Sequence, residues 1–334
     1  MSKASAPPLG HWVQNFFCQR LQAQRQVSPH TLASYRDTLR LLLAFVEQKT
    51  ARSPSQQTLG DWNAQTILKF LDHLEKQRGC QARTRNVRLA ALRSFMRYVS
   101  QQSPENLALT SQVLAIPFKR FDRPLIEPLS EAEVRAILAA TDPATASGRR
   151  DHLLFNFLYH TGARVSEALQ LRHQDIHWGA PVTVCLHGKG RKERVIPLLK
   201  PIAQELKRAL AQLPPEPASL VFENRLGQPL TRWGVQKRLR RTVQQAVQHC
   251  PSLKGRRVSP HTFRHTTAMG LLQADVDIMV IALILGHESP TTTHHYIELD
   301  IQMKERCLRK LASPKTKTAR FKPTDQLLKF PDTL

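Results

Sequence analysis

The sequence predicts a mainly helical protein with a small β-sheet, an α+β fold in two domains, and three observations support this prediction. The chain has 334 residues, enough to form two hydrophobic cores of ordinary size. Apolar residues recur at spacings of three and four over most of its length, which is typical of helices with one buried face. Residues 182–197, by contrast, indicate two short strands on either side of the turn sequence Gly188-Lys189-Gly190.

Changes in periodicity and composition divide the chain into five predicted parts. Helical periodicity fades between residues 104 and 128, where prolines recur and Lys119 and Arg120 add positive charge, so this stretch is predicted to be an interdomain linker. The other parts are a flexible N-terminus (1–9), a helical domain (10–103), a larger second domain (129–312) and a basic tail (313–334).

Four helices are predicted in the N-terminal domain. Ser28 followed by Pro29 marks the start of the second, because Ser can cap the first N–H groups of a helix and Pro fits its first turn. Each of the four carries an apolar stripe at helical spacing. Their predicted ranges are 11–24, 29 to about 46, 63–77 and 82–100.

The last of these helices carries arginines beside its apolar stripe. Like charges three and four residues apart repel each other unless an anion lies among them. We therefore predict phosphate contact for this face, with an ordinary solvated face as the alternative. The arginines are Arg83, Arg85, Arg88, Arg93 and Arg97.

The second domain is predicted to begin with a helix whose capping box is formed by Ser130 and Glu133. A helix over 152–159 is expected to end at Gly162, and the next begins around Arg164. After the two strands come helices over 202–213 and 231–249, with a short buried apolar run over 219–222 between them. The last of these helices exposes Lys237 and Arg241, which we predict to contact DNA.

Residues 259–296 hold the densest group of reactive side chains. Ser259 and Pro260 start a helix, so His261 and Arg264 lie in its first turns on one face. Unpaired N–H groups at a helix start attract anions, and these two side chains would strengthen a phosphate site there. Tyr296 has polar neighbours, whereas the other three tyrosines of the chain lie among apolar residues.

The charge of the chain points to a polyanionic partner. The formal net charge is +23, with 15 basic and 6 acidic residues before Pro117 and 34 and 20 after it. Because both halves are basic, we expect a protein that holds nucleic acid along its length, the alternative being a basic protein that binds nothing.

Cysteine usage and hydropathy bear on the compartment. The five cysteines are scattered and form no Cys-x-x-Cys pair, which is typical of reduced thiols in a cytoplasmic protein. No segment reaches the roughly 18 apolar residues of a membrane span, and the N-terminus has no apolar core behind basic residues. We therefore expect a cytoplasmic protein with no membrane partner.

Metal and nucleotide chemistry are disfavoured by the spacing of the residues. His261 and His265 lie four apart, but the residues between them include no Glu for a His-Glu-x-x-His zinc motif, and Arg264 would repel a dication. Gly188-Lys189-Gly190 lacks the remainder of a phosphate-binding P-loop. No metal and no cofactor are predicted.

These residues together resemble the tyrosine recombinase (phage integrase) family. The resemblance rests on Thr161-Gly162-x-Arg164-x-Ser166-Glu167, on the His-x-x-Arg box from His261 to Arg264, and on Leu285-Gly286-His287 followed nine residues later by Tyr296. It implies that residues 10–103 form a DNA core-binding domain and residues 129–312 the catalytic domain.

The resemblance also implies a role for each site residue. Tyr296 would be the nucleophile, the two arginines would bind the scissile phosphate, and the two histidines would hydrogen-bond the phosphate and manage protons. Lys189 would be the general acid for the leaving oxygen, with Glu167 in support. The implied catalytic residues are Arg164, Lys189, His261, Arg264, His287 and Tyr296.

By the same resemblance, the protein would be a site-specific recombinase that cleaves and rejoins double-stranded DNA through a covalent 3′-phosphotyrosyl intermediate, without ATP. It would act as a homo-tetramer held together by a C-terminal helix near residues 301–311. Two alternatives are DNA relaxation like that of type IB topoisomerases and a catalytically silent DNA-binding protein on the same fold. The sequence leaves open a Xer-like resolvase or a mobile-element integrase.

Overall fold

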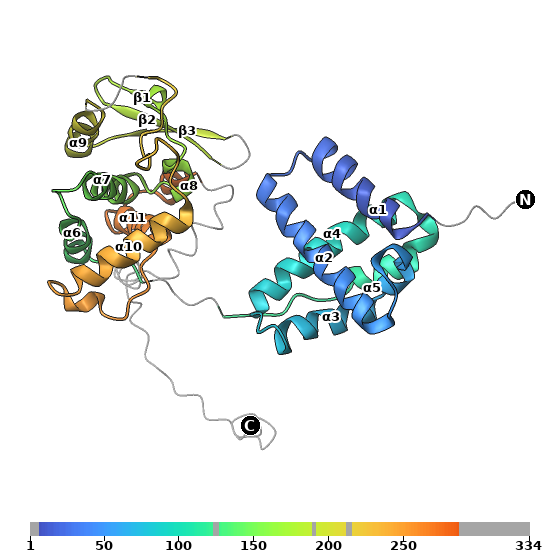
Figure 1. Cartoon of the computed structure of the whole chain (residues 1–334). Helices are drawn as coiled ribbons and strands as arrows, with labels where there is room; N and C mark the ends of the chain where they lie inside the picture. Colours follow the sequence, from blue (N-terminus) through green and yellow to red (C-terminus); the bar gives the residue numbers. More distant parts are fainter. Residues whose placement is uncertain (1–6, 123–126, 189–191, 212–215, 287–334) are drawn as a thin grey trace, which may run out of the picture. The chain divides into compact units, whose positions relative to one another are not determined.

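The computed structural model describes residues 7–122, 127–188, 192–211 and 216–286 (Figure 1). The chain divides into two compact units, Met1–Pro124 and Leu125–Leu334. The predicted fold class is confirmed, because both units are mainly helical and the second contains one small sheet.

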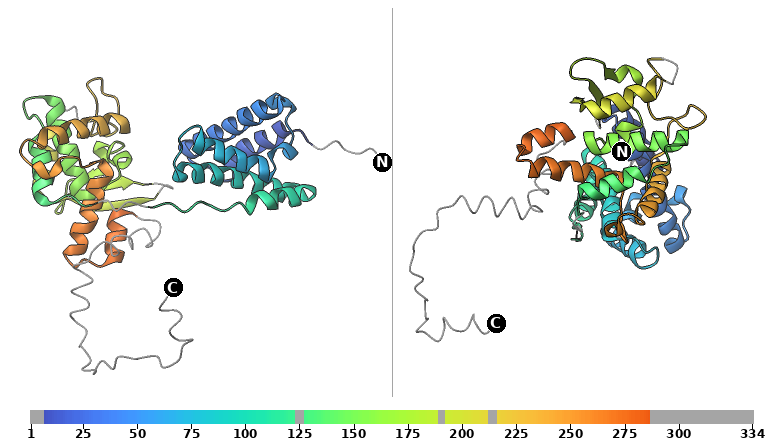
Figure 2. Two further views of the ribbon diagram at one scale, coloured as in Figure 1. Left: turned by 90° about the horizontal axis from the view of Figure 1, so that it is seen from below. Right: turned by 90° about the vertical axis from the view of Figure 1, so that its left-hand side faces the viewer.

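The N-terminal unit is a helical bundle (Figures 1 and 2). The first predicted helix begins at Leu9 and continues beyond Asn15 as a π-helical segment, Phe16–Gln24. Trp62, Phe95 and Leu42 are among the fully buried side chains at its centre. The helices are α1 (Leu9–Asn15), α2 (Pro29–Thr50), α3 (Ala64–Lys76), α4 (Ala82–Gln102) and α5 (Leu107–Leu114).

Helix α5 lies inside the stretch predicted as a linker. It packs against α4 and α3, and its Val113 is completely buried in the N-terminal core. An eight-residue segment is too short to show a clear helical stripe in the sequence and is stable only through its packing. The N-terminal unit therefore has five α-helices within its described residues, one more than the sequence indicated.

Capping residues set the helix starts much as predicted. The side-chain oxygens of Ser28, Ser130 and Ser259 accept hydrogen bonds from the backbone N–H groups of Thr31, Glu133 and Thr262. Each bond satisfies a donor that the first helical turn leaves open. The predicted starts of α2, α6 and α11 are therefore confirmed to within a residue.

The C-terminal unit places a small sheet at one edge of a group of helices (Figure 1). The helix predicted over 152–159 was too short, because α7 covers 16 residues. The helix expected to begin around Arg164 does so and has a single turn. Its helices are α6 (Glu131–Ala139), α7 (Ala146–Thr161), α8 (Val165–Ala168), α9 (Lys200–Leu210), α10 (Arg232–Ala246), α11 (Pro260–Gln273) and α12 (Ile278–Leu285).

The sheet is antiparallel, in the order β1 (Ile176–His177), β2 (Thr183–His187) and β3 (Glu193–Pro197). The two predicted strands are β2 and β3, whose register pairs Cys185 with Val195 and His187 with Glu193. The two-residue strand β1 was not predicted, because so short a strand has no alternation to detect.

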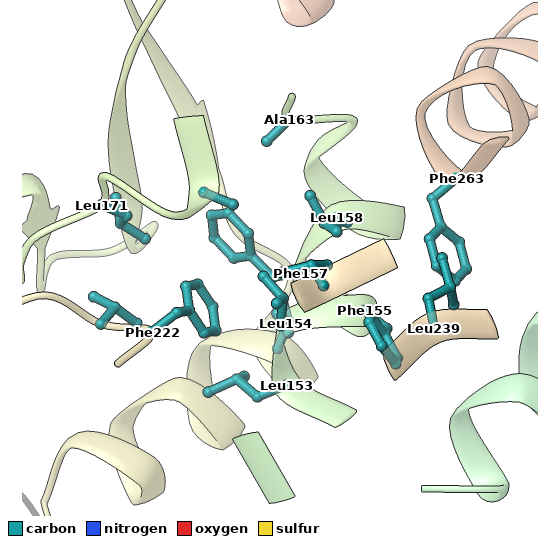
Figure 3. Close-up of a cluster of buried hydrophobic side chains, with 14 of the residues drawn as sticks. Leu153, Leu154, Phe155, Phe157, Leu158, Ala163, Leu171, Phe222, Leu239 and Phe263 are labelled. Carbon is teal, nitrogen blue, oxygen red and sulfur yellow. The ribbon is translucent and has the colours of Figure 1, made fainter. Parts of the chain in front are cut away.

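Aromatic side chains from distant parts of the chain fill the core of this unit (Figure 3). Phe155 of α7 stacks on Phe263 of α11 with ring centroids 6.1 Å apart, and Phe157 contacts Phe222 at 5.7 Å. The burial of Phe222 confirms the predicted apolar run. Stacking between α7 and α11 brings the end of α7 to the first turns of α11, where the predicted site residues lie.

Among the helices of the described residues, none combines the length and the apolar character needed to cross a membrane.

Candidate active site

The described residues include four of the seven side chains predicted for the site. Arg164 precedes α8 as its N-cap residue, and Glu167 lies within that helix. His261 and Arg264 lie in the first turns of α11, the former exposed and the latter 1% exposed. The remaining three, Lys189, His287 and Tyr296, fall outside the described residues.

Arg264 is fixed between the ends of two helices. Its Nη1 donates to the carbonyl oxygen of Gly162 at 2.7 Å, and its Nη2 donates to that of Leu285 at 2.6 Å. Gly162 ends α7 and Leu285 ends α12. The carbonyl end of a helix carries partial negative charge, so these two carbonyl groups stabilise the buried guanidinium.

Glycine at position 162 permits this junction. Its φ is 60°, in the left-handed region that favours glycine. A Cβ atom there would lie 2.5 Å from Cδ2 of Leu285, too close for the two helix ends to keep their separation. The Thr-Gly-x-Arg sequence therefore turns the chain sharply from α7 towards Arg164 while α12 packs against the turn.

Arg164 is bonded to Glu167 and to α12. Its Nη1 donates to Oε1 of Glu167 at 2.7 Å, and its Nη2 donates to the Gly286 carbonyl at 3.1 Å. The backbone N–H of Arg164 also donates to Oε2 of Glu167 at 2.8 Å. About a third of the Arg164 side chain is exposed, so it can meet a ligand from solvent while held in place.

Arg194 is a member of this cluster that the sequence reasoning missed. It lies on β3, and its Nη2 donates to Oε2 of Glu167 at 2.7 Å. The alternation of faces along a strand could have identified it from the sequence. A strand alternates its faces, so Arg194 shares a face with the buried Ile196 two residues later, and an inward-facing arginine requires a partner.

Glu167 keeps its negative charge although it is 4% exposed. Burial by itself raises the pKa of this carboxyl, but hydrogen bonds from Arg194 and from the backbone and side chain of Arg164 lower the pKa below its ordinary value. The site therefore contains a buried carboxylate shared by two guanidinium groups.

A second group of ionisable residues lies on β2 and β3. His187 Nδ1 is 3.0 Å from Glu193 Oε1, and its Nε2 is 3.2 Å from Asp175 Oδ1. The hydrogen bond with Asp175 and then the other contacts with the two carboxylates raise the pKa of His187. Cys185 lies close enough to complete a group of three possible metal ligands with His187 and Glu193.

The residues predicted to contact DNA differ in their surroundings. On α4, Arg83 and Arg97 are exposed, whereas Arg85 is 5% exposed and donates to the Pro117 carbonyl at 3.2 Å. Arg88 donates to Ser34 O and Thr38 Oγ1 at 3.1 and 3.0 Å. The burial of Arg85 favours a structural role over phosphate contact.

Four further candidates for DNA contact lie outside α4. Lys119 donates to Oε2 of Glu75 at 2.7 Å, and Arg120 next to it is exposed. Lys237 and Arg241 are both exposed on α10, as predicted.

Arg93, the remaining candidate on α4, lies over the ring of Phe118, with 4.9 Å between its Cζ and the ring centroid.

The sequence of this chain is similar to those of known protein families and relatives. The family model "Phage integrase family" matches residues 127–303, and "Phage integrase, N-terminal SAM-like domain" matches residues 15–103. The chain is 44% identical over 331 residues to y4rC of Sinorhizobium fredii, whose name describes an integrase/recombinase, with 99% of each chain covered. It is 30% identical over 312 residues to the tyrosine recombinase XerC of Chlamydia muridarum, covering 86% of this chain and 94% of XerC.

A solved structure supports the fold. A lambda integrase tetramer bound to a Holliday junction is similar with a TM-score of 0.65 and 16% identity, over 95% of this chain and 82% of that one. The family-model match covers more than half of the chain and the first relative is similar over its whole length. The chain belongs to the phage integrase family, the tyrosine site-specific recombinases.

Proposed function

We propose that this recombinase cleaves and rejoins specific double-stranded DNA sites through a covalent 3′-phosphotyrosyl bond to Tyr296. The observation that carries the proposal is the convergence of Arg164 and Arg264, 100 positions apart in the sequence, at the end of α12. That end is one residue before His287 and ten before Tyr296. A guanidinium pair beside a tyrosine suits attack on a phosphodiester without a metal.

The proposed reaction conserves the energy of the phosphodiester. The Tyr296 oxygen loses its proton to a nearby base and bonds to phosphorus, while the bond from phosphorus to the 5′-oxygen breaks. Lys189 gives the leaving 5′-oxygen its proton, and Arg164 and Arg264 bind the non-bridging oxygens as charge builds on them. Attack by a 5′-hydroxyl of the partner DNA reverses these steps, so neither ATP nor water is consumed.

His261 and His287 complete the proposed set. His261, exposed in the first turn of α11, is placed to hydrogen-bond a phosphate oxygen at a helix N-terminus. His287 directly follows the α12 end held by the arginines. DNA relaxation and a silent binding protein are not favoured, because the relatives are named as recombinases.

The test uses the variant Tyr296→Phe and measures the covalent protein–DNA adduct that it forms on a nicked duplex substrate. Sequencing the junctions formed in cells that express the protein supplies the DNA site. The variant is expected to bind this DNA like wild type and to form no adduct. Tyr159→Phe, which changes a half-buried tyrosine of α7, is the matched control and should form adduct normally. Persistent adduct in the Tyr296 variant would refute the assignment.

We further propose that DNA lies against both basic units in the cytoplasm and that four copies assemble on two sites. The described part of α4 offers Arg83 and Arg97, and α10 offers Lys237 and Arg241. The named lambda integrase tetramer supports a tetramer on DNA. The apolar stripe of residues 301–311 suits docking of this segment on a neighbouring copy.

Truncation after Asp300 tests the assembly. If the segment docks on a neighbour, binding to a single site survives while cooperative assembly and strand exchange are lost. Unchanged recombination by the truncated protein would rule out this docking.

A further inference from the structure

Arg194 makes contacts that connect three parts of the active site. Its Nη2 binds Glu167, and its Nε donates to the Ile284 carbonyl at 2.8 Å. These partners are 27 and 90 positions away in the sequence. Only 11% of the side chain is exposed, so its guanidinium contacts the protein more than solvent.

Three arginines together hold the end of α12. Its last carbonyls would have no partner within the helix, because the residues that would donate to them lie beyond its end. Each carbonyl of residues 284–286 instead accepts from a different arginine. The donors, in the order of these carbonyls, are Arg194, Arg264 and Arg164, which we name the arginine clamp.

Gly286 leaves room for Arg194 within the clamp. A Cβ atom at this position would lie 2.9 Å from Nη1 of Arg194 and 3.2 Å from its Cδ. Its φ of 62° also favours glycine. The Leu-Gly-His sequence thus has a physical reason here, since the glycine both turns the chain and admits the arginine one residue before His287.

The charges of the cluster give Arg194 a second effect. A pair of Arg164 and Glu167 alone would be neutral, which would weaken the attraction of Arg164 for phosphate. Glu167 is bonded to both Arg164 and Arg194, so these three side chains together retain one positive charge.

We propose that Arg194 is a positioning residue for strand cleavage. It fixes the end of α12 ahead of His287, and it shares Glu167 so that Arg164 keeps positive charge for the scissile phosphate. Because it lies on β3, which pairs with β2, it also ties these two strands to α12. This inference rests on the proposed function and adds a residue that does not itself touch DNA.

The molecule contains a matched control for this arginine. Arg150 donates to Asp151, which is also bonded by Arg238, and to the Glu223 carbonyl. The Arg150 side chain is 14% exposed, close to the 11% of Arg194. Asp151 lies eleven positions before Gly162, about 16 Å along the axis of α7. Arg150→Met thus breaks an equivalent set of bonds away from the site.

The experiment compares single-turnover adduct formation on the nicked duplex by full-length wild type, Arg194→Met, Arg150→Met and the double variant Arg194→Met with Glu167→Gln. Binding of an intact single site and thermal unfolding are measured alongside. Arg194→Met is expected to reduce the cleavage rate about 100-fold with binding nearly unchanged. Arg150→Met is expected to change the rate less than about threefold, although both variants lose stability.

The double variant separates positioning from general support of the fold. In Arg194→Met, the Glu167 carboxylate neutralises the positive charge of Arg164. Glu167→Gln removes that carboxylate charge, so the double variant should cleave at least about tenfold faster than Arg194→Met. Arg194→Lys serves as a milder variant if methionine prevents folding. Lysine keeps the charge but lacks the guanidinium fork, and an intermediate rate is expected.

The results that would overturn the inference are specific. A rate within about threefold of wild type for Arg194→Met, an equal loss in Arg150→Met, or a double variant no faster than Arg194→Met would each do so. If wild type itself forms no adduct, the proposed function fails instead, so the two failures are distinguishable.

Discussion

The arginines of α4 and those of the arginine clamp are the same residue type in very different surroundings. On α4, Arg85 and Arg88 bond to carbonyls and side chains of neighbouring segments, which holds the helical bundle together. In the clamp, guanidinium groups from the start of α8, β3 and α11 meet at one helix end, and the first two share the Glu167 carboxylate. The number of arginines on a helix is therefore a weak indication of phosphate binding. A place where several arginines meet with fewer carboxylates than guanidinium groups is a stronger one.

The largest expected effect separates these two groups by activity. Arg164→Ala should lower the rate of adduct formation about 100- to 1,000-fold, because a phosphate ligand is lost as charge develops. Arg85→Met should change that rate less than about threefold. The measurement is single-turnover cleavage under saturating protein, and equal losses in the two variants would abolish the distinction.

A second prediction concerns the carboxylates that the two regions contain. Glu167→Gln should cost about 3 kcal/mol of unfolding free energy near pH 7, since it removes a buried charge shared by two arginines. Glu75→Gln should cost less, about 1 kcal/mol, because its partner Lys119 is half exposed and its other partner, Arg85, is 3.9 Å away. Chemical denaturation of both variants measures the difference, and a larger loss for Glu75→Gln would reverse the comparison.

The pH dependence of the Glu167 effect follows from its pKa. The pKa in the folded protein lies below the ordinary value of 4.5, so the stability from this carboxylate is fully present above pH 4.5. It is lost as the pH falls through the folded-state pKa. The difference between wild type and Glu167→Gln should therefore shrink below pH 4.5, and a difference that grows there would contradict the assigned ionisation.

A third prediction divides the arginines of α4 themselves. Arg85→Met should destabilise the protein by about 1–3 kcal/mol, because the buried arginine loses its hydrogen bonds to the Pro117 carbonyl and to Asn86. It should leave the salt dependence of DNA binding unchanged. Changing the exposed Arg83 and Arg97 to Ala should leave stability within about 0.5 kcal/mol. If both contact phosphates, the slope of log K against log salt should decrease in magnitude by about 1.8. An unaltered slope would make this face a solvated one.

The smallest expected effect concerns Arg93, which lies over Phe118. Phe118→Leu keeps an apolar side chain but removes the aromatic face, so we expect a loss of about 0.5–1 kcal/mol in stability. Arg93→Met combined with Phe118→Leu should cost little more than either change alone. Additive losses in this double-mutant cycle would show that the two side chains do not interact.

The sequence by itself determined the class of fold, most helix starts and the family. Caps such as Ser28, Ser130 and Ser259 act on N–H groups within three residues, and apolar stripes repeat within a few turns, so both can be recognised locally. The spacing of His261 to Arg264 and of Leu285 to Tyr296 is likewise contained in short segments. Family resemblance therefore predicted the site residues without reference to their contacts.

Only the tertiary structure decided which arginines support the fold and which gather at the site. Arg85 depends on Pro117, 32 positions later, and Arg194 depends on Glu167 and Ile284, which are 27 and 90 positions away. Helix α5 depends on packing against α4, since eight residues cannot form a stable helix alone. The contacts of Arg194 arise where β3 meets α8 and α12, and no local pattern of charge or hydropathy records that meeting.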